Sequence, residues 1–151
     1  MVIPFLRRGL ESHEACLWVV SRTIGVLEAI EALQRGYDLT PFLGNGQLLV
    51  VPAEQWYLDR GQFSERKAFQ KLKKFIEDRE HRGYRHFRGV GDLAWLEGED
   101  WPAFQLFEKK VHQWIQEFGL TAVCAYPIQQ CSVTQTKDVL DHHDSVFQTK
   151  L

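Results

Sequence analysis

Hydrophobic residues gather in four short runs along the chain, and longer segments with helical spacing separate them. Residues 15–20 read ACLWVV and residues 47–51 read QLLVV. A weaker run covers residues 86–90, and TAVCAY at residues 121–126 precedes Pro127. Short continuous apolar runs are typical of strands that are buried on both faces. The pattern therefore predicts four strands.

Apolar positions three and four residues apart predict helices between these runs. The clearest stripe lies between Pro102 and Gly119, where six apolar residues recur at helical steps. A stripe in residues 24–33 and another that starts at Ser64 predict two further helices. One more helix is expected ahead of the first strand, and a short one in residues 137–140.

The alternation of strands and helices predicts the fold class. Strands joined by helical crossovers pair in parallel and are covered on both faces. We therefore expect an α/β domain with three layers, in which helices flank a mostly parallel sheet. A length of 151 residues suits one domain, and we expect it to span residues 1–151.

Composition and charge exclude several classes of protein. Apolar residues make up 44% of the chain and aromatic residues 13%, which excludes global disorder. Eighteen Lys and Arg against twenty Asp and Glu give a formal charge of −2, so a globally basic nucleic-acid binder is not expected. No apolar run approaches the roughly twenty residues of a membrane span. We expect no partnership with membrane or nucleic acid.

The cysteines indicate a reducing, cytoplasmic location. Cys16, Cys124 and Cys131 are odd in number and form no CxxC pair, which argues against a disulfide framework or a structural zinc site. Cys16 and Cys124 lie in apolar runs and are expected to be buried, whereas Cys131 is the expected exposed thiol. The sequence DHHD at residues 141–144 is predicted to be a hydrated loop, because adjacent side chains diverge. We expect neither a metal nor another cofactor.

Sequence motifs for catalysis are missing. The chain has no GxxxxGK[ST], GxGxxG, GxSxG or HExxH. A ligand site is instead expected at the carboxyl ends of the strands, where parallel sheets open into a crevice. Arg82, Arg85, His86 and Arg88 lead into a strand and a glycine turn, and we expect them to face this crevice. Aromatic side chains are expected to line an apolar hollow there.

The ordered segments FLRRGLESHEACLWVV, GQLLVVPAEQWYLDRGQF, HFRGVGDLAWL, FEKKVHQW, AVCAYP and HHDSV resemble the MEDS family, the methanogen/methylotroph sensory domains of the DcmR type. The resemblance implies a non-catalytic sensory domain on a RecA-like, degenerate ATPase-like fold. It also implies a small hydrocarbon derivative as ligand and a signalling or transcription-regulatory output as partner. The ligand-binding residues that it implies are Arg88, Gly91, Asp92, Trp95, Glu108, Cys124, Tyr126 and His143.

The chain departs from the family pattern in three places. The family opens with a strand that contains a His, whereas this chain begins inside the following helix. A missing strand predicts an unpaired edge or a gap in the sheet, which dimerisation or strand exchange would fill. Asp92 stands where Glu is more frequent, and Pro127 stands where Asp is frequent.

Two functional hypotheses follow from these patterns. The first is a sensor that binds its ligand with Arg88 on the polar end and with Trp95 and Tyr126 around the remainder. The second is an interaction module on the same fold, which forms a homo-oligomer or docks on a signalling partner without a ligand. An enzyme is not expected.

Overall fold

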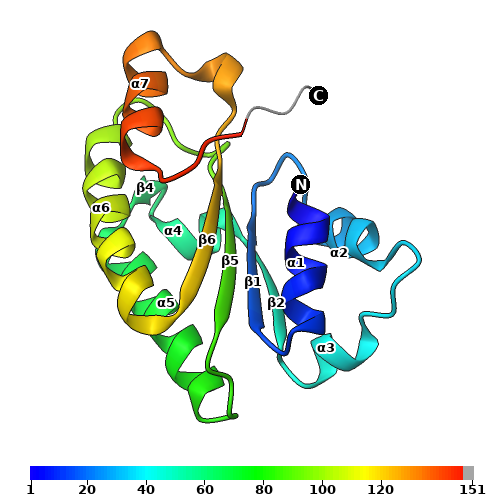
Figure 1. Ribbon diagram of the computed structural model, residues 1–151. Helices are drawn as coiled ribbons and strands as arrows, with labels where there is room; N and C mark the ends of the chain where they lie inside the picture. The colour runs from blue at the N-terminus through cyan, green and yellow to red at the C-terminus, as the bar shows by residue number, and fades with distance from the viewer. Residues whose placement is uncertain (148–151) are drawn as a thin grey trace.

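Four parallel strands form the middle layer of the structure, which is a computed structural model that describes residues 1–147. The strands are β1 (Ala15–Val20), β2 (Leu48–Pro52), β5 (Phe87–Asp92) and β6 (Leu120–Ala125), in the spatial order β2-β1-β5-β6. Figure 1 shows helices on both faces of this sheet. The three-layer α/β fold with a parallel sheet is therefore confirmed. The first predicted strand has the observed bounds, and the other three differ from the observed strands by one or two residues at their ends.

Strand β1 lies at the centre because its side chains are apolar on both faces. It pairs with β2 on one side, with Cys16 opposite Leu48, and with β5 on the other, with Ala15 opposite Phe87. All six residues of β1 are buried, and none is more than 5% exposed. Alternate side chains of one continuous apolar run therefore enter two separate cores.

One core lies beneath the helices α1 (Val2–Glu11), α2 (Val26–Gln34) and α3 (Thr40–Gly44), on the right in Figure 1. Its fully buried members include Leu6 of α1 and Leu33 of α2. Helix α1 covers both β1 and β5.

The other core lies beneath α4 (Ala53–Tyr57), α5 (Glu65–Glu80) and α6 (Trp101–Phe118), on the left in Figure 1. Ser64 caps α5 by accepting a hydrogen bond from the backbone N–H of Lys67 (3.3 Å), as expected. Gly119 ends α6 in the left-handed conformation, with φ at 63°. The sequence predicts the start of α5 and the end of α6 correctly because Ser and Gly have specific roles at helix ends.

The sequence does not predict several short helices and strands. Helices α3 and α4 have five residues each, and the hairpin of β3 (Leu58–Asp59) and β4 (Gln62–Phe63) has two residues in each strand. Elements of this length contain too few positions for a period to emerge. A 3-10 turn (Ile128–Gln130) follows β6, and α7 (Val133–His142) is longer than the expected helix at residues 137–140.

Helix α7 begins at a capping box that the sequence contains. The Ser132 hydroxyl accepts from the backbone N–H of Gln135, and the Gln135 side chain accepts from the backbone N–H of Ser132. This motif marks the first turn of the helix. The expected polar tail runs on to Leu151, and its last four residues lie outside the described part of the chain.

The sheet is continuous, with β2 and β6 at its edges. Because β1 hydrogen-bonds to both β2 and β5, the expected gap does not exist between the described strands. Helix α1 precedes β1, as expected from the family resemblance. Dimerisation across an open edge stays a prediction. Within residues 1–147, none of the helices combines the length and the apolar character that crossing a bilayer requires.

Candidate functional site

Polar side chains from three elements meet at the carboxyl ends of β5 and β6. The strands are in register there, with Gly91 opposite Cys124. Helix α7 lies at this end of the sheet, beside α6 (Figure 1). We use the name strand-end cluster for five residues of α6, β6 and the segments that follow β6. They are Gln105, Glu108, Cys124, Tyr126 and His143.

The centre of the strand-end cluster is a group of three side chains that could hold a metal ion. One ligand atom each from Glu108, Cys124 and His143 lies within 4.8 Å of the other two. The Oε1 atom of Glu108 is 3.6 Å from Nε2 of His143. The Glu108 side chain is 10% exposed and that of His143 is 23% exposed. The carboxylate is thus largely removed from water at a point where a thiol and an imidazole approach it.

His143 is oriented by the end of α7. Its Nδ1 lies 2.7 Å from the backbone carbonyl of Val139, which can only accept a hydrogen bond, so Nδ1 carries the hydrogen. The Tyr126 ring meets the imidazole edge-on, with 5.9 Å between the ring centroids. These contacts direct Nε2 of His143 toward the Glu108 carboxylate.

Burial and the Glu108 carboxylate shift the acidity of their neighbours. Burial raises the pKa of the Cys124 thiol well above its usual value, and the negative charge of Glu108 raises that pKa further. The same two causes, in the same order, raise the pKa of Tyr126. Interaction with Glu108 raises the pKa of His143 above 6.5, although partial burial opposes this shift. Without a cation, Cys124 and Tyr126 stay protonated at neutral pH.

Four buried polar atoms in this region have no hydrogen-bond partner within the described chain. They are Nε1 of Trp95, Oε1 of Gln105, Oε1 of Glu108 and the hydroxyl oxygen of Tyr126. Leaving such a group unpaired costs about 1–3 kcal/mol. Such groups are rare in native folds, and a bound water, ion or ligand is one way in which they are satisfied. Three of these four atoms belong to the strand-end cluster, which therefore retains the capacity to bind a polar group.

A small hollow opens next to the strand-end cluster. It has a volume of about 60 Å³, and Trp101 and Tyr126 form its aromatic wall. A hollow with two aromatic residues therefore lies at the strand ends, but it is narrow and its exposed lining is mainly polar, whereas the sequence predicts an apolar one. Trp95 does not line it: its ring stacks on Tyr57, with centroids 4.9 Å apart, and packs against Phe104. A larger hollow, about 180 Å³, lies elsewhere, between β2, α4 and α5.

Gly91 and Asp92 have structural partners at the end of β5. A side chain at Gly91 would meet the Tyr57 hydroxyl, because an added Cβ would lie 2.7 Å from that oxygen. The buried Asp92 carboxylate accepts hydrogen bonds from the Ser21 hydroxyl and from the backbone N–H groups of Ser21 (3.3 Å) and Ala94 (3.1 Å). Asp92 thereby joins the end of β1 to the loop that follows β5.

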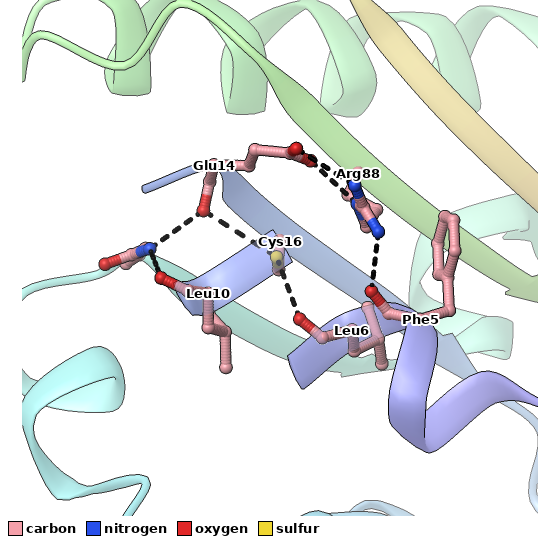
Figure 2. A network of polar contacts seen from close by, with 7 residues as sticks. Phe5, Leu6, Leu10, Glu14, Cys16 and Arg88 are labelled. Atoms are coloured by element: carbon pink, nitrogen blue, oxygen red, sulfur yellow. Dashed lines mark hydrogen bonds and ion pairs between the residues drawn. The ribbon is translucent and has the colours of Figure 1, made fainter. Parts of the chain in front are cut away.

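Arg88 lies away from the strand-end cluster, and its expected position at the carboxyl end of a strand is wrong. It is the second residue of β5, so it lies near the amino end of that strand. Its guanidinium donates to both carboxylate oxygens of Glu14 (2.7 and 2.9 Å) and to the Phe5 carbonyl (2.9 Å), as Figure 2 shows. Arg82, Arg85 and His86 precede β5, so they lie at the same amino end of the strand as Arg88 and away from the crevice.

Gly9 of α1 allows this contact between α1 and β5. A Cβ on Gly9 would lie 2.7 Å from Sγ of Cys16 and 2.9 Å from Cδ of Arg88. Burial, followed by the charge of Glu14, raises the pKa of Cys16 to about 12. Figure 2 shows the Cys16 thiol directed at the Leu6 carbonyl, 3.7 Å away. Arg88 and Glu14 therefore fasten α1 to the sheet, and Cys16 is an inert core residue beside them.

The sequence does not single out Gln105, and it places Trp101 only among the aromatic residues expected to line an apolar hollow. Gln105 is 8% exposed and sits between Phe104 and Phe107 on the buried side of α6. A polar residue in an apolar stripe is the signal that would have identified it, because burial of an amide requires partners. Trp101 starts α6, and its Nε1 donates to Asp138 of α7 (3.1 Å), a contact between distant residues that no local pattern reveals.

Comparison with known proteins gives one match. The family model described as MEDS, the methanogen/methylotroph DcmR sensory domain, matches residues 1–144. No curated protein and no solved structure matches the chain.

The Arg88–Glu14 contact predicts a stability difference between two arginine variants. The Arg88 and Glu14 side chains are only 15% and 17% exposed, so Arg88→Gln leaves a mostly buried carboxylate unpaired. We expect a loss of about 3–5 kcal/mol in the free energy of unfolding, measured by urea denaturation. Arg22 is 87% exposed and pairs with Glu54 at 3.6 Å, so Arg22→Gln should cost under about 1 kcal/mol. Equal losses would contradict the structural role of Arg88.

The three thiols are expected to react in a fixed order. Burial raises the pKa of Cys16 to about 12, and partial burial together with the charge of Glu108 raises the pKa of Cys124 well above its usual value. Cys131 is also half-buried, but no negative charge adds to the rise in its pKa. Iodoacetamide at pH 8 should therefore label Cys131 first in the native, metal-free protein, and label the other two only in urea. Peptide mass spectrometry identifies the modified residue. Early modification of Cys124 in the native protein would show that the strand-end cluster is open to solvent.

Proposed function

Because the chain belongs to the MEDS family of sensory domains, we propose that it senses a small molecule bound at the strand-end cluster. The observation that supports this proposal is the group of buried polar atoms that lack partners in the described chain, on Gln105, Glu108 and Tyr126. A ligand with a polar head would supply the missing hydrogen bonds, while the aromatic wall would contact its apolar remainder.

The dimensions of the site favour a ligand of few heavy atoms. The hollow beside Tyr126 measures about 60 Å³, and Trp101 closes one side of it. A small hydrocarbon derivative with one polar group fits this combination of size and chemistry. Arg88 takes no part in binding, because Glu14 and the Phe5 carbonyl occupy its guanidinium.

Helix α7 is the element through which the signal would leave the site. It contributes one buried side chain, Val139, to the described core. Two polar contacts join this part of the chain to α6: the Trp101–Asp138 hydrogen bond, and the pair of Glu108 with His143, the residue that follows α7. A ligand that binds Glu108 competes with His143, so it changes the affinity of α7 for α6. Such a difference in affinity is what shifts an equilibrium between two arrangements. The arrangement of α7 would then be read by a signalling or transcription-regulatory partner.

A thermal-shift screen with alcohols, amines, thiols and halides of one or two carbons tests the proposed ligand site. A ligand at 100 times its Kd stabilises the fold by about 2.7 kcal/mol, which should raise Tm by about 5–10 °C. Tyr126→Phe should abolish this shift. The same substitution removes an unpaired hydroxyl, so the ligand-free variant should be at least as stable as the natural protein.

Tyr37→Phe is the matched control, because Tyr37 packs on the opposite side of the sheet. It should leave the ligand-induced shift unchanged. The ligand hypothesis fails if no compound of the panel raises Tm. The proposed location of the ligand at the strand-end cluster is wrong if a compound raises Tm equally in Tyr126→Phe and in the natural protein.

A second candidate function is an interaction module in which a copy of this chain covers the β2 edge. The supporting observation is the larger hollow, about 180 Å³, which borders this open edge. Leu49, Val51, Trp56 and Phe75 give it an apolar floor. An unpaired strand edge with an apolar face beside it is a surface suited to self-association.

Light scattering during size-exclusion chromatography tests this second function. Self-association predicts twice the mass of one chain at micromolar concentration, and Val51→Asp should restore the monomer by placing a charge in the interface. Leu27→Asp changes a side chain that is already 73% exposed on another face and should leave the dimer intact. A monomer for the natural protein at every concentration would rule the module out as a homodimer.

A further inference from the structure

We propose that Glu108, Cys124 and His143 bind a divalent transition-metal ion, with zinc preferred. The three residues come from α6, from β6 and from the residue that follows α7, and their ligand atoms lie within 4.8 Å of one another. Thiolate, imidazole and carboxylate together are a ligand set typical of zinc. Three protein ligands leave the fourth tetrahedral position open for a water molecule or a small ligand.

The spacing of the ligand atoms is close to what a tetrahedral site needs. Zinc bonds of about 2.0–2.3 Å place the ligand atoms about 3.3–3.6 Å from one another. The Glu108 and His143 atoms are already 3.6 Å apart. Cys124 Sγ lies within 4.8 Å of both, so a movement of about 1 Å completes the site. Rotation about side-chain bonds supplies a displacement of this size.

The hydrogen bonds around the group prepare it for a cation. The Val139 carbonyl holds the hydrogen on Nδ1 of His143, which leaves Nε2 as the atom with the lone pair when the ring is neutral. The Gln105 amide lies 3.3 Å from Oε2 of Glu108, whereas Oε1 has no hydrogen-bond partner in the described chain. A neutral Nε2 and a carboxylate oxygen both carry electron pairs, so a positive charge between them satisfies both.

Charge balance supports the same assignment. A thiolate on Cys124 beside the Glu108 carboxylate would place two negative charges in a mostly buried site, which is costly without a counterion. A divalent ion cancels both charges and releases the thiol proton to solvent. The ligands are 16 and 19 residues apart in sequence (108, 124 and 143), which explains why no zinc motif appears in the chain.

This inference stands apart from the proposed sensory function. The metal site requires only the three side chains and their surroundings, whereas the sensor requires an organic ligand and a response of α7. Metal binding without any response to the compound panel would therefore leave the zinc site in place and remove the sensor hypothesis.

The test uses the full chain, treated with a chelator, dialysed, and kept reduced with a phosphine. Titration with Co²⁺ should produce the thiolate-to-cobalt charge-transfer band in the near ultraviolet and saturate at one equivalent. Competition of Zn²⁺ with a chromophoric chelator then gives the zinc affinity. Cys124→Ser, His143→Gln and Glu108→Gln should each weaken zinc binding more than about tenfold, because they remove ligands rather than their supporting contacts.

Two neighbouring residues provide matched controls. Cys131→Ser removes a thiol on the turn after β6. His142→Gln removes the imidazole next to His143 in sequence, and the Nδ1 atom of His142 lies 2.7 Å from the Asp138 carbonyl. Both should change zinc affinity less than about twofold. Circular dichroism of every metal-free variant confirms that it is folded.

Three results would overturn the zinc site. One is the absence of a charge-transfer band in the natural protein. The second is a band that persists in Cys124→Ser and disappears in Cys131→Ser. The third is equal zinc affinity in His143→Gln and His142→Gln. Any of these would leave the Glu108–His143 contact as a simple ion pair.

Discussion

Burial of β1 on both of its faces is the constraint on which the remaining structure depends. The run ACLWVV pairs with β2 and β5 at once, so it has no face or edge in contact with water. Helices must then cover both faces of the sheet, and the crossovers must be right-handed and of helical length. Parallel pairing directs all four strands the same way. This fixed polarity decides which residues gather at the carboxyl ends and which gather at the amino ends.

The two ends of β5 show opposite ways of treating buried polar groups. At the amino end, Arg88 and Glu14 pair with each other, and the Phe5 carbonyl accepts a third hydrogen bond from the guanidinium. At the carboxyl end, Glu108 and Tyr126 leave oxygen atoms without partners in the described chain. A satisfied pair stabilises the fold and needs nothing further. An unsatisfied group costs stability, and a bound ion or molecule would recover that cost.

A metal ion and a sensory ligand would interact with different polar groups of the strand-end cluster. A zinc ion would neutralise Glu108 and Cys124 and use the lone pair of His143, while its open position would face a small ligand. The Tyr126 hydroxyl and the Gln105 amide would remain to orient that ligand. Since His143 follows α7 directly, both events would act on the one helix that contributes a single buried side chain to the core.

The sequence by itself determined the fold class and the main strands, because β1, β2 and β6 are short apolar runs between segments of helical period, although only β1 is buried at every residue. It also determined the start of α5 and the end of α6, because Ser64 is one of the few residue types that cap a helix and Gly119 adopts the left-handed conformation that glycine favours. Family resemblance supplied Glu108, Cys124, Tyr126 and His143 as candidates, but it grouped Arg88 with them. Only the tertiary structure separated Arg88 from that group, because the position of a residue along a strand sets the end of the sheet at which it lies. Only the tertiary structure brought Glu108, Cys124 and His143 together, since contacts between distant residues depend on packing and leave no local period.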